Sequence, residues 1–337
     1  MGERRKRPAQ KLPFRTYGHR RRRVRRRSVG LAVGILAAVL VTSWATGRIG
    51  DTIHSIAGAS PAIEALDPSA FSPGACVALA PTAGNRHLTV FLDAGHGGLD
   101  PGAVGTTTSG ATIYEAEETL PVELDAAAIL RGHGFRVVVS RTTNRSVVRL
   151  SNVEVAGGEL SLQGAHDDVA ARDVCANLAH ADVLVGIYFD SGASAQNAGS
   201  LTMYDTARPF ASANGRLATL VQNDVLTAMN AQGWRIPNAG VVSDSNEGSS
   251  VTTTSTGALA TGAASYNHVL LLGPGMAGYF STPSQMPGAL IEPLFITDPA
   301  EGSIAASGAG QTAIARGLAT AIEQYFASPA PIANTQS

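Results

Sequence analysis

The stretch Leu92–Gly105 reads LDAGHGGLDPGAVG and directly follows the apolar run Leu88–Phe91. The run predicts a strand, and the glycines after it let the backbone turn sharply without bulky side chains in the way. The turn presents one histidine, His96. Neutral imidazole is the commonest protein ligand for zinc, so this stretch indicates a metal ligand at a strand end. A surface loop with an inert histidine is the alternative interpretation.

Strand-like and helix-like segments alternate from Leu88 onward, which predicts an α/β domain. Pro121 is compatible with the first of the expected helices only if it falls in the first turn. Residues 243–265 are rich in small and polar residues and predict a long loop, placed where a lid over a cleft would lie. The expected strands are 88–93, 135–140, 183–189, 200–204 and 289–296, and the expected helices are 116–130, 169–179, 217–229 and 314–326.

The charge of the chain is divided unevenly between its two ends. Residues 1–28 hold 13 of the 25 lysines and arginines but one of the 26 acids, so the remainder has 12 basic and 25 acidic residues, a net charge of about −13. A basic head before an acidic body is a signal of membrane topology. No basic cleft is evident in the acidic body, so we expect no nucleic-acid partner.

An uncharged run of 18 residues, Val29–Thr46, follows the basic head and is just long enough to span a bilayer. Trp44 suits the lipid–water interface at its far end, and the arginines before it predict a cytoplasmic N-terminus. The expected location is the cell membrane, single-pass, with the C-terminal domain outside the cytoplasm. Secretion after cleavage of a signal peptide is the alternative.

These signals divide the chain into five expected parts. They are a basic cytoplasmic tail (1–28), a transmembrane anchor (29–46), a stalk (47–87), one α/β domain (88–328) and a disordered tail (329–337). The chain has two cysteines, Cys76 and Cys175. An even pair in an exported domain permits one disulfide, and two unpaired thiols are the alternative.

Two glutamates are candidates for chemistry. Glu292 interrupts the apolar run 289–296, and a carboxylate at the end of a buried strand is costly unless it is paired or used. A buried salt bridge is the structural alternative for Glu292. Glu115 belongs to an acidic group just before a helix, where its charge would by itself favour the helix N-terminus.

Together these segments resemble the zinc-dependent N-acetylmuramoyl-L-alanine amidases of the amidase type 3 family, from about Leu88 to Phe326. The opening motif of that family resembles Leu92–Gly105, which makes His96 the first zinc ligand. The resemblance makes Glu115 the second ligand and Glu292 the catalytic glutamate. Further similar segments are Gly134 with Ser140–Arg141, Arg172–Asn177 with Ala181–Asp182, Trp234–Val241, Met286–Glu292, and Phe295, Pro299 and Glu301. The resemblance implies one domain with a mixed central sheet and helices on both faces.

The chain departs from that family at the third zinc ligand. The family has a histidine after the strand that follows Ala181–Asp182, and here Tyr188 stands in its place. A phenol has a reference pKa near 10 and must lose its proton to bind zinc well. Asp190, two residues on, is a substitute ligand in the expected pattern, and His166 and His268 are further candidates. Leu294 also replaces a glycine that the family usually has.

Two functions follow from this resemblance. In the first, the protein is a peptidoglycan hydrolase that cuts the amide between N-acetylmuramic acid and L-alanine of the stem peptide. Zinc on His96, Glu115 and a substitute ligand would activate water, with Glu292 as general base. In the second, the zinc site is incomplete and the domain binds peptidoglycan or regulates another wall enzyme without cutting. In both, the partners are the stem peptide and glycan, with the cytoplasmic membrane bound through the N-terminal helix.

Overall fold

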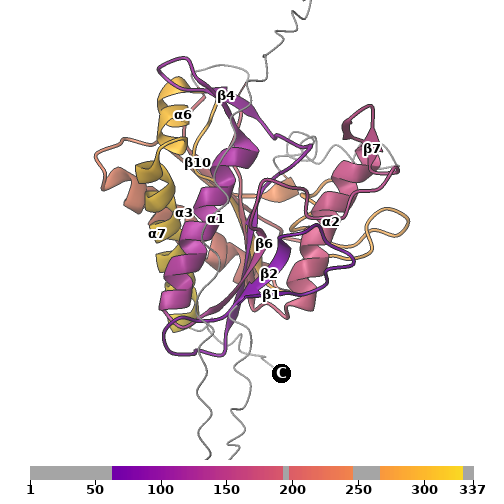
Figure 1. The fold of residues 1–337 in the computed structure, drawn as a ribbon. Helices are drawn as coiled ribbons and strands as arrows, with labels where there is room; N and C mark the ends of the chain where they lie inside the picture. The colour runs from indigo at the N-terminus through magenta and orange to yellow at the C-terminus, as the bar shows by residue number, and fades with distance from the viewer. Residues whose placement is uncertain (1–62, 193–196, 246–265, 329–337) are drawn as a thin grey trace, which may run out of the picture. The chain divides into compact units, whose positions relative to one another are not determined.

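An eight-stranded mixed sheet forms the centre of the computed structural model, which describes residues 63–192, 197–245 and 266–328 (Figure 1). Four central strands, β6, β3, β9 and β12, are parallel, while β2 runs antiparallel to β6, and β10 antiparallel to β12. In spatial order the strands are β1 (Ile63–Ala65), β2 (Ala75–Leu79), β6 (Arg136–Arg141), β3 (Thr89–Ala94), β9 (Val183–Ile187), β12 (Gly288–Glu292), β10 (Ser200–Tyr204) and β11 (Asn238–Ser243). The expected mixed α/β sheet is therefore confirmed.

Helices cover both faces of the sheet, as the resemblance implies (Figure 1). One face carries α1 (Glu115–Gly132), α3 (Ala211–Asn230) and α7 (Gly308–Ala327), and the other carries α2 (Leu162–Leu178). The remaining elements are the short helix α6 (Pro299–Ala305) and two small hairpins, β4 (Val104–Thr106) with β5 (Thr112–Tyr114), and β7 (Val155–Ala156) with β8 (Glu159–Leu160).

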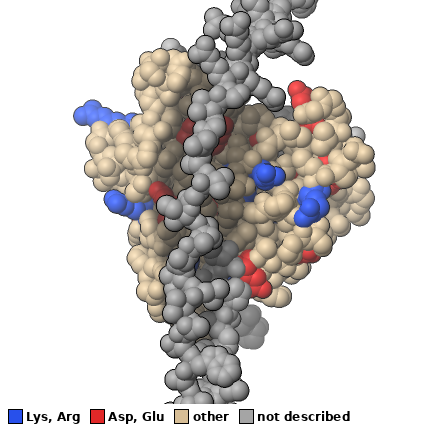
Figure 2. Space-filling view, viewed as in Figure 1, with Lys and Arg blue, Asp and Glu red and all other residues tan. Residues whose placement is uncertain are grey.

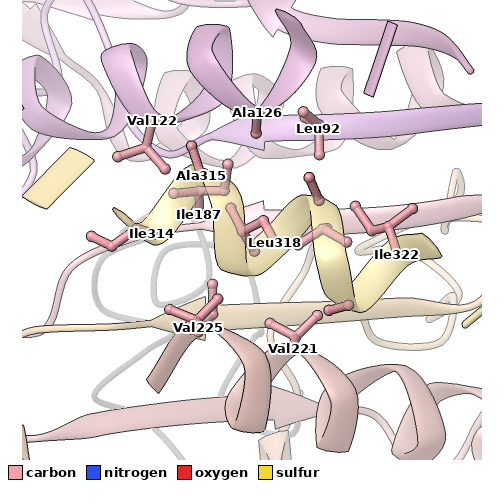
Figure 3. Close-up of a cluster of buried hydrophobic side chains, with 14 of the residues drawn as sticks. Leu92, Val122, Ala126, Ile187, Val221, Val225, Ile314, Ala315, Leu318 and Ile322 are labelled. Atoms are coloured by element: carbon pink, nitrogen blue, oxygen red, sulfur yellow. The ribbon is translucent and has the colours of Figure 1, made fainter. Parts of the chain in front are cut away.

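The larger hydrophobic core lies between the three-helix layer and the sheet. Figure 3 shows side chains of α7 between those of α1 and α3, close to Leu92 and Ile187 from the sheet. Strands β3, β9 and β12 are buried along nearly their whole length, because helices cover them on both sides. Continuous apolar runs are what such parallel strands require, which is why the sequence identifies them so readily.

The structure differs from the expected stalk over the described part of its range. Residues 63–79 supply β1 and β2, which extend the sheet at one edge. Ala75–Leu79 is a buried strand, but its only sequence signal is a short run of small and apolar residues among prolines and glycines. A short edge strand of this kind has no long apolar run to reveal it.

Helix α1 begins earlier relative to its proline than the sequence suggests. It starts at Glu115, so Pro121 lies in the helix as its seventh residue and not in the first turn. The backbone N–H groups of Glu115 and Ala116 donate to Ala103 and Pro101, which fixes the start of the helix against the preceding loop. Since Pro121 has no N–H, one hydrogen bond of the second turn is absent, and the helix tolerates this.

Cys76 and Cys175 form a disulfide that joins β2 to α2 across 99 positions of sequence. Both cysteines are fully buried in the core on the α2 face. The sequence permitted either a disulfide or two free thiols, and the structure has the disulfide. This bond links β2, near one edge of the sheet, to the helix that carries Arg172.

Several expectations fall outside the described residues. The basic tail (1–28), the anchor (29–46), most of the loop 243–265 and the tail after 328 belong to them. Within the described ranges, no helix has the length and apolar character needed to cross a membrane. On the face shown in Figure 2, arginines and acidic residues are scattered, and most of the described surface is uncharged.

Candidate functional site

Three candidate residues follow strands that end level with one another. Ala94 at the end of β3 pairs with Ile187 at the end of β9, and Ile187 pairs with Ile291 of β12. His96, Tyr188 and Glu292 come one or two residues beyond this row. The carboxyl edge of parallel strands is where open α/β sheets bind ligands, and these three residues lie at that edge.

Two buried arginines hold the loop that carries His96. Arg172 on α2 donates to the carbonyl oxygens of Ala94 (2.7 Å) and His96 (2.8 Å) and pairs with the carboxylates of Asp93 and Asp168. Arg141 at the end of β6 donates to the carbonyl oxygens of Ala94 and Gly95 from its own position. The sequence marked both arginines only as part of a family pattern, while their contacts show that they position the loop.

Both ring nitrogens of His96 face carboxylates. Nδ1 lies 2.8 Å from Oδ2 of Asp100, and Nε2 lies 3.1 Å from Oε1 of Glu115. Burial lowers the pKa of His96, but the charges of Glu115 and Asp100 outweigh it and raise the pKa to about 10. Nε2 is buried and has no hydrogen-bond partner within the described residues. A buried ring nitrogen that faces a carboxylate without a hydrogen bond, its other nitrogen oriented by Asp100, fits two ligands of a metal ion.

Glu115 is fixed from two sides at the start of α1. Its Oε1 accepts the backbone N–H of Phe189 and its Oε2 accepts that of Ala103, both at 2.9 Å. Gly102, with a φ of +67°, leaves the space these groups need, because a Cβ there would lie 2.6 Å from the His96 ring. The fold therefore holds Glu115 against His96, as the resemblance implies for two neighbouring ligands.

Tyr188 occupies the position of the expected third ligand but faces elsewhere. Its hydroxyl donates to Oδ2 of Asp93 at 3.1 Å, and its ring packs against that of His96 at 5.3 Å between centroids. Burial, and next the charge of Asp93, raise the pKa of Tyr188 well above its ordinary value. A Cβ on Gly95 would lie 2.5 Å from the tyrosine ring, so the glycine makes room for it. Tyr188 is thus a packed hydrogen-bond donor and does not fit as a zinc ligand.

Glu292 is 8% exposed at the end of β12, on the same sheet face as Leu290. The backbone of Asp190 bonds to Leu294 and Ile296, and its carboxylate accepts the N–H of Ser191. His166 contacts Asp167 and the ring of Tyr279. Among the described residues, none of these three joins His96 and Glu115 in a group of three converging ligands.

Leu294 stands where the family usually has glycine. The fold accommodates it, since its side chain is fully buried in the main core.

A narrow pocket opens beside His96 and Tyr188. Arg172, Leu290 and residues 269–271 form its other walls, and its free volume is about 20 Å³. This volume holds about one water molecule. A sugar or peptide must therefore lie outside the pocket, with only a small group reaching inward.

A second cluster lies where sequence reasoning did not place a site. Asp205, Asp244 and His268 bring their ligand atoms within 4.8 Å of one another, and no other three histidines, cysteines or acids do so within the described ranges. Asp205 follows β10 and Asp244 follows β11, whose last residues Tyr204 and Ser243 are paired in parallel register. Asp205 directly follows the expected strand 200–204, which was the available signal, but β11 was not an expected strand, so Asp244 had no such signal.

Comparison with known proteins agrees with the geometry. Residues 90–324 match the family described as N-acetylmuramoyl-L-alanine amidase. N-acetylmuramoyl-L-alanine amidase AmiA of Salmonella typhimurium is 37% identical over 73 residues, which are 22% of this chain and 24% of that protein. The chain thus matches about a quarter of the length of this curated relative.

The chain is also similar to solved amidase structures. The CwlD amidase of Clostridioides difficile, solved in complex with the GerS lipoprotein, has a TM-score of 0.52 at 18% identity, with 71% of this chain and 98% of that chain covered. The amidase AmiC2 of Nostoc punctiforme has a TM-score of 0.48 at 23% identity, with 73% and 100% covered. At 18% identity, the likeness to CwlD supports the arrangement of sheet and helices and nothing finer.

Proposed function

Because the chain belongs to the N-acetylmuramoyl-L-alanine amidase family, we propose that it hydrolyses the amide between N-acetylmuramic acid and L-alanine in peptidoglycan. The observation that carries the proposal is the buried His96–Glu115 pair, 3.1 Å apart, beside the strand row that ends in Glu292. A protein that only packs has no need to bury a glutamate against an unsatisfied imidazole nitrogen.

His96 and Glu115 would hold a zinc ion in this proposal. Zinc bound there would polarise the amide carbonyl and lower the pKa of a water molecule. Asp100 would keep the His96 ring in place through Nδ1, and Arg172 would keep the loop backbone in place. Two protein ligands are one fewer than catalytic zinc usually has, and Asp190 does not converge with them, so the remaining contacts would come from solvent.

Glu292 is assigned the proton transfers. Its carboxylate takes a proton from the attacking water as the water oxygen bonds to the amide carbon. It then passes this proton to the alanine nitrogen as the carbon–nitrogen bond breaks. The products are the lactyl carboxylate on the glycan and a stem peptide with a free amino group, so atoms and charge balance.

A second candidate function is peptidoglycan binding or regulation without cleavage. The specific observation in its favour is Tyr188, which stands at the position of the third ligand and whose hydroxyl is bonded to Asp93. In this case the domain would keep its fold and its binding to the cell wall but would not hydrolyse the amide.

We also propose that the domain acts outside the cytoplasm, anchored through residues 29–46. The support is the charge asymmetry and the uncharged run in the sequence. Peptidoglycan lies on that side of the membrane, which is consistent with the proposed substrate.

The test is release of free alanine amino groups from purified peptidoglycan by the full chain in detergent. We expect Glu292→Gln to lower the rate by about 10²–10⁴-fold, the usual contribution of a general base. Glu117→Gln, an exposed change on α1, is the control and should leave the rate unchanged. Wild-type binding to peptidoglycan without release would favour the second candidate. Full activity of Glu292→Gln would remove Glu292 from the mechanism.

A further inference from the structure

The cluster of Asp205, Asp244 and His268 lies at the opposite end of the sheet from Glu292. Strand β10 runs antiparallel to β12, and Leu201 pairs with Glu292. Asp205 is four residues further along β10, about 13 Å away at 3.3 Å per residue. A metal ion at the His96–Glu115 pair therefore does not account for this cluster.

The ligand atoms of the cluster meet around one nitrogen. Nδ1 of His268 lies 2.7 Å from Oδ2 of Asp205 and 3.3 Å from Oδ2 of Asp244. Both aspartate side chains are fully buried, while that of His268 is 21% exposed. Two carboxylates and an imidazole are thus enclosed together, with access to solvent through the histidine.

Hydrogen bonding within the described residues does not satisfy these groups. Oδ2 of Asp205, Oδ1 of Asp244 and Nδ1 of His268 are all buried without a hydrogen-bond partner there. Other atoms of the same aspartates are well used, since Oδ1 of Asp205 accepts the N–H groups of Ala207 and Arg208. The carboxylates are therefore held in place by the backbone, and the unpartnered Oδ2 of Asp205 and Nδ1 of His268 face each other.

An ion pair explains this arrangement poorly. One N–H of His268 serves Asp205 at 2.7 Å and leaves Asp244 with the longer contact of 3.3 Å. A cation placed among the three atoms contacts all of them. Tetrahedral zinc with bonds of about 2.0–2.1 Å places its ligand atoms about 3.3 Å apart. This matches the separation of His268 and Asp244, while His268 and Asp205, at 2.7 Å, would move apart on binding.

We propose that Asp205, Asp244 and His268 form a second metal site that binds one zinc ion. The imidazole nitrogen disfavours calcium and magnesium, which prefer oxygen ligands in larger numbers. Three protein ligands leave a fourth position for water. The site is independent of the amidase proposal, because it uses none of the residues assigned there.

The bound zinc would hold in place residues 269–271, which form one wall of the pocket beside His96. Asp244 and His268 are 24 positions apart and flank residues 246–265. Asp244 also accepts the backbone N–H of Val269, and residues 269–271 line the pocket. A metal on His268 would therefore fix the start of this wall relative to β10 and β11.

The test is the zinc content of the full chain in detergent, stripped with a chelator and reloaded with zinc. We expect His268→Gln and Asp244→Asn each to lose one zinc per chain. His96→Ala should keep that zinc, and His133→Gln is the matched control. His133 also pairs with a carboxylate, that of Glu323, but on the surface.

A second readout uses the His96→Ala variant, which lacks a ligand of the other site but keeps all three residues of this cluster. X-ray absorption at the zinc edge of this reloaded variant should show one nitrogen and two carboxylate oxygens at about 2.0–2.2 Å from the zinc ion. The proposal is overturned if His96→Ala loses all zinc, or if His268→Gln and Asp244→Asn fold and retain as much as wild type. It is also overturned if the reloaded wild type binds no zinc.

Discussion

The two ligand clusters of this domain differ in how they were found and in what they contain. The His96–Glu115 pair was predicted from a glycine-rich motif, and in the structure it comprises two converging ligands with Tyr188 packed beside them. The cluster of Asp205, Asp244 and His268 has no motif, yet three ligand atoms converge there. A sequence motif thus indicates which loop forms a site. The number of metal ligands in that site depends on which side chains converge in the folded structure.

The clusters also differ in how they are supported. The loop of His96 is held by Arg172 and Arg141, both almost completely buried. Near the second cluster, Arg208 is partly buried and donates to the carbonyl oxygens of Gly273 and Ser284. Removing the support should therefore affect the first cluster more, and the following predictions test this from the largest effect to the smallest.

The largest effect is expected from Arg172→Met. This change leaves Asp93 and Asp168 as buried carboxylates without their partner, and breaking such a pair costs about 3–5 kcal/mol. Chemical denaturation of the full chain should show this loss in the free energy of unfolding. Arg208→Met should cost clearly less, because Arg208 pairs with neutral carbonyl groups. Equal losses of unfolding free energy in the two variants would contradict the idea that Arg172 stabilises its site more than Arg208 does.

Replacing Tyr188 by histidine should convert the pair into a three-ligand site. We expect zinc affinity at His96–Glu115 to rise by at least about 10-fold, the gain from about 1.4 kcal/mol. Zinc titration in the His268→Gln background separates this site from the second cluster. Tyr188→Phe is the control and should leave the affinity unchanged. No gain with histidine would show that the end of β9 does not present a ligand to the site.

The contact between the two ligands should be sensitive to one added methyl group. Gly102→Ala places a Cβ against the His96 ring and Glu115, so we expect a loss of about 1–3 kcal/mol in unfolding free energy. Gly110→Ala is the matched control, since it also has a positive φ but nothing within 4 Å of the added atom. Both changes share the backbone strain, so their difference measures the crowding alone. A difference near zero would mean that the loop relaxes freely.

The smallest effect is expected at Glu301, whose carboxylate contacts the segment before β10 and the segment after β12. Its carboxylate accepts the N–H groups of Gly199, before β10, and Phe295, after β12. Burial, with added repulsion from Asp298 and Asp190, raises its pKa from 4.5 to about 7 despite these hydrogen bonds. The folded state thus keeps a proton that the unfolded chain releases, and this group's contribution to stability falls as pH rises from about 4.5 to about 7.

Glu301→Gln removes the charge and keeps one oxygen, which can accept from both N–H groups because that of Gly199 also lies 3.2 Å from Oε2, the acceptor for Phe295. We therefore expect its Tm, relative to wild type, to be higher at pH 8 than at pH 5. Glu117→Gln, on the exposed side of α1, should show no such dependence on pH. An equal shift at both pH values for Glu301→Gln would place its pKa near the ordinary value.

The sequence predicted much of this fold because its central strands are long apolar runs between helices. A family pattern also predicted His96, Glu115 and Glu292 as site residues, and the structure places His96 and Glu115 in contact. The direction of the Tyr188 hydroxyl was not predictable, since it depends on Asp93 from a neighbouring strand. The second cluster was not predicted because its three residues are far apart in sequence. Only the folded chain brings His268 next to Asp205 and Asp244, and no local sequence pattern indicates that contact.

The disulfide between Cys76 and Cys175 has a consequence for a broken chain. His96, Glu115, Arg141 and Arg172 all lie between these two cysteines in sequence. One cut in the backbone anywhere along that length leaves two fragments that stay covalently joined. The loop of His96 and the arginines that hold it would therefore remain one molecule after a single proteolytic cut, and would separate only after reduction.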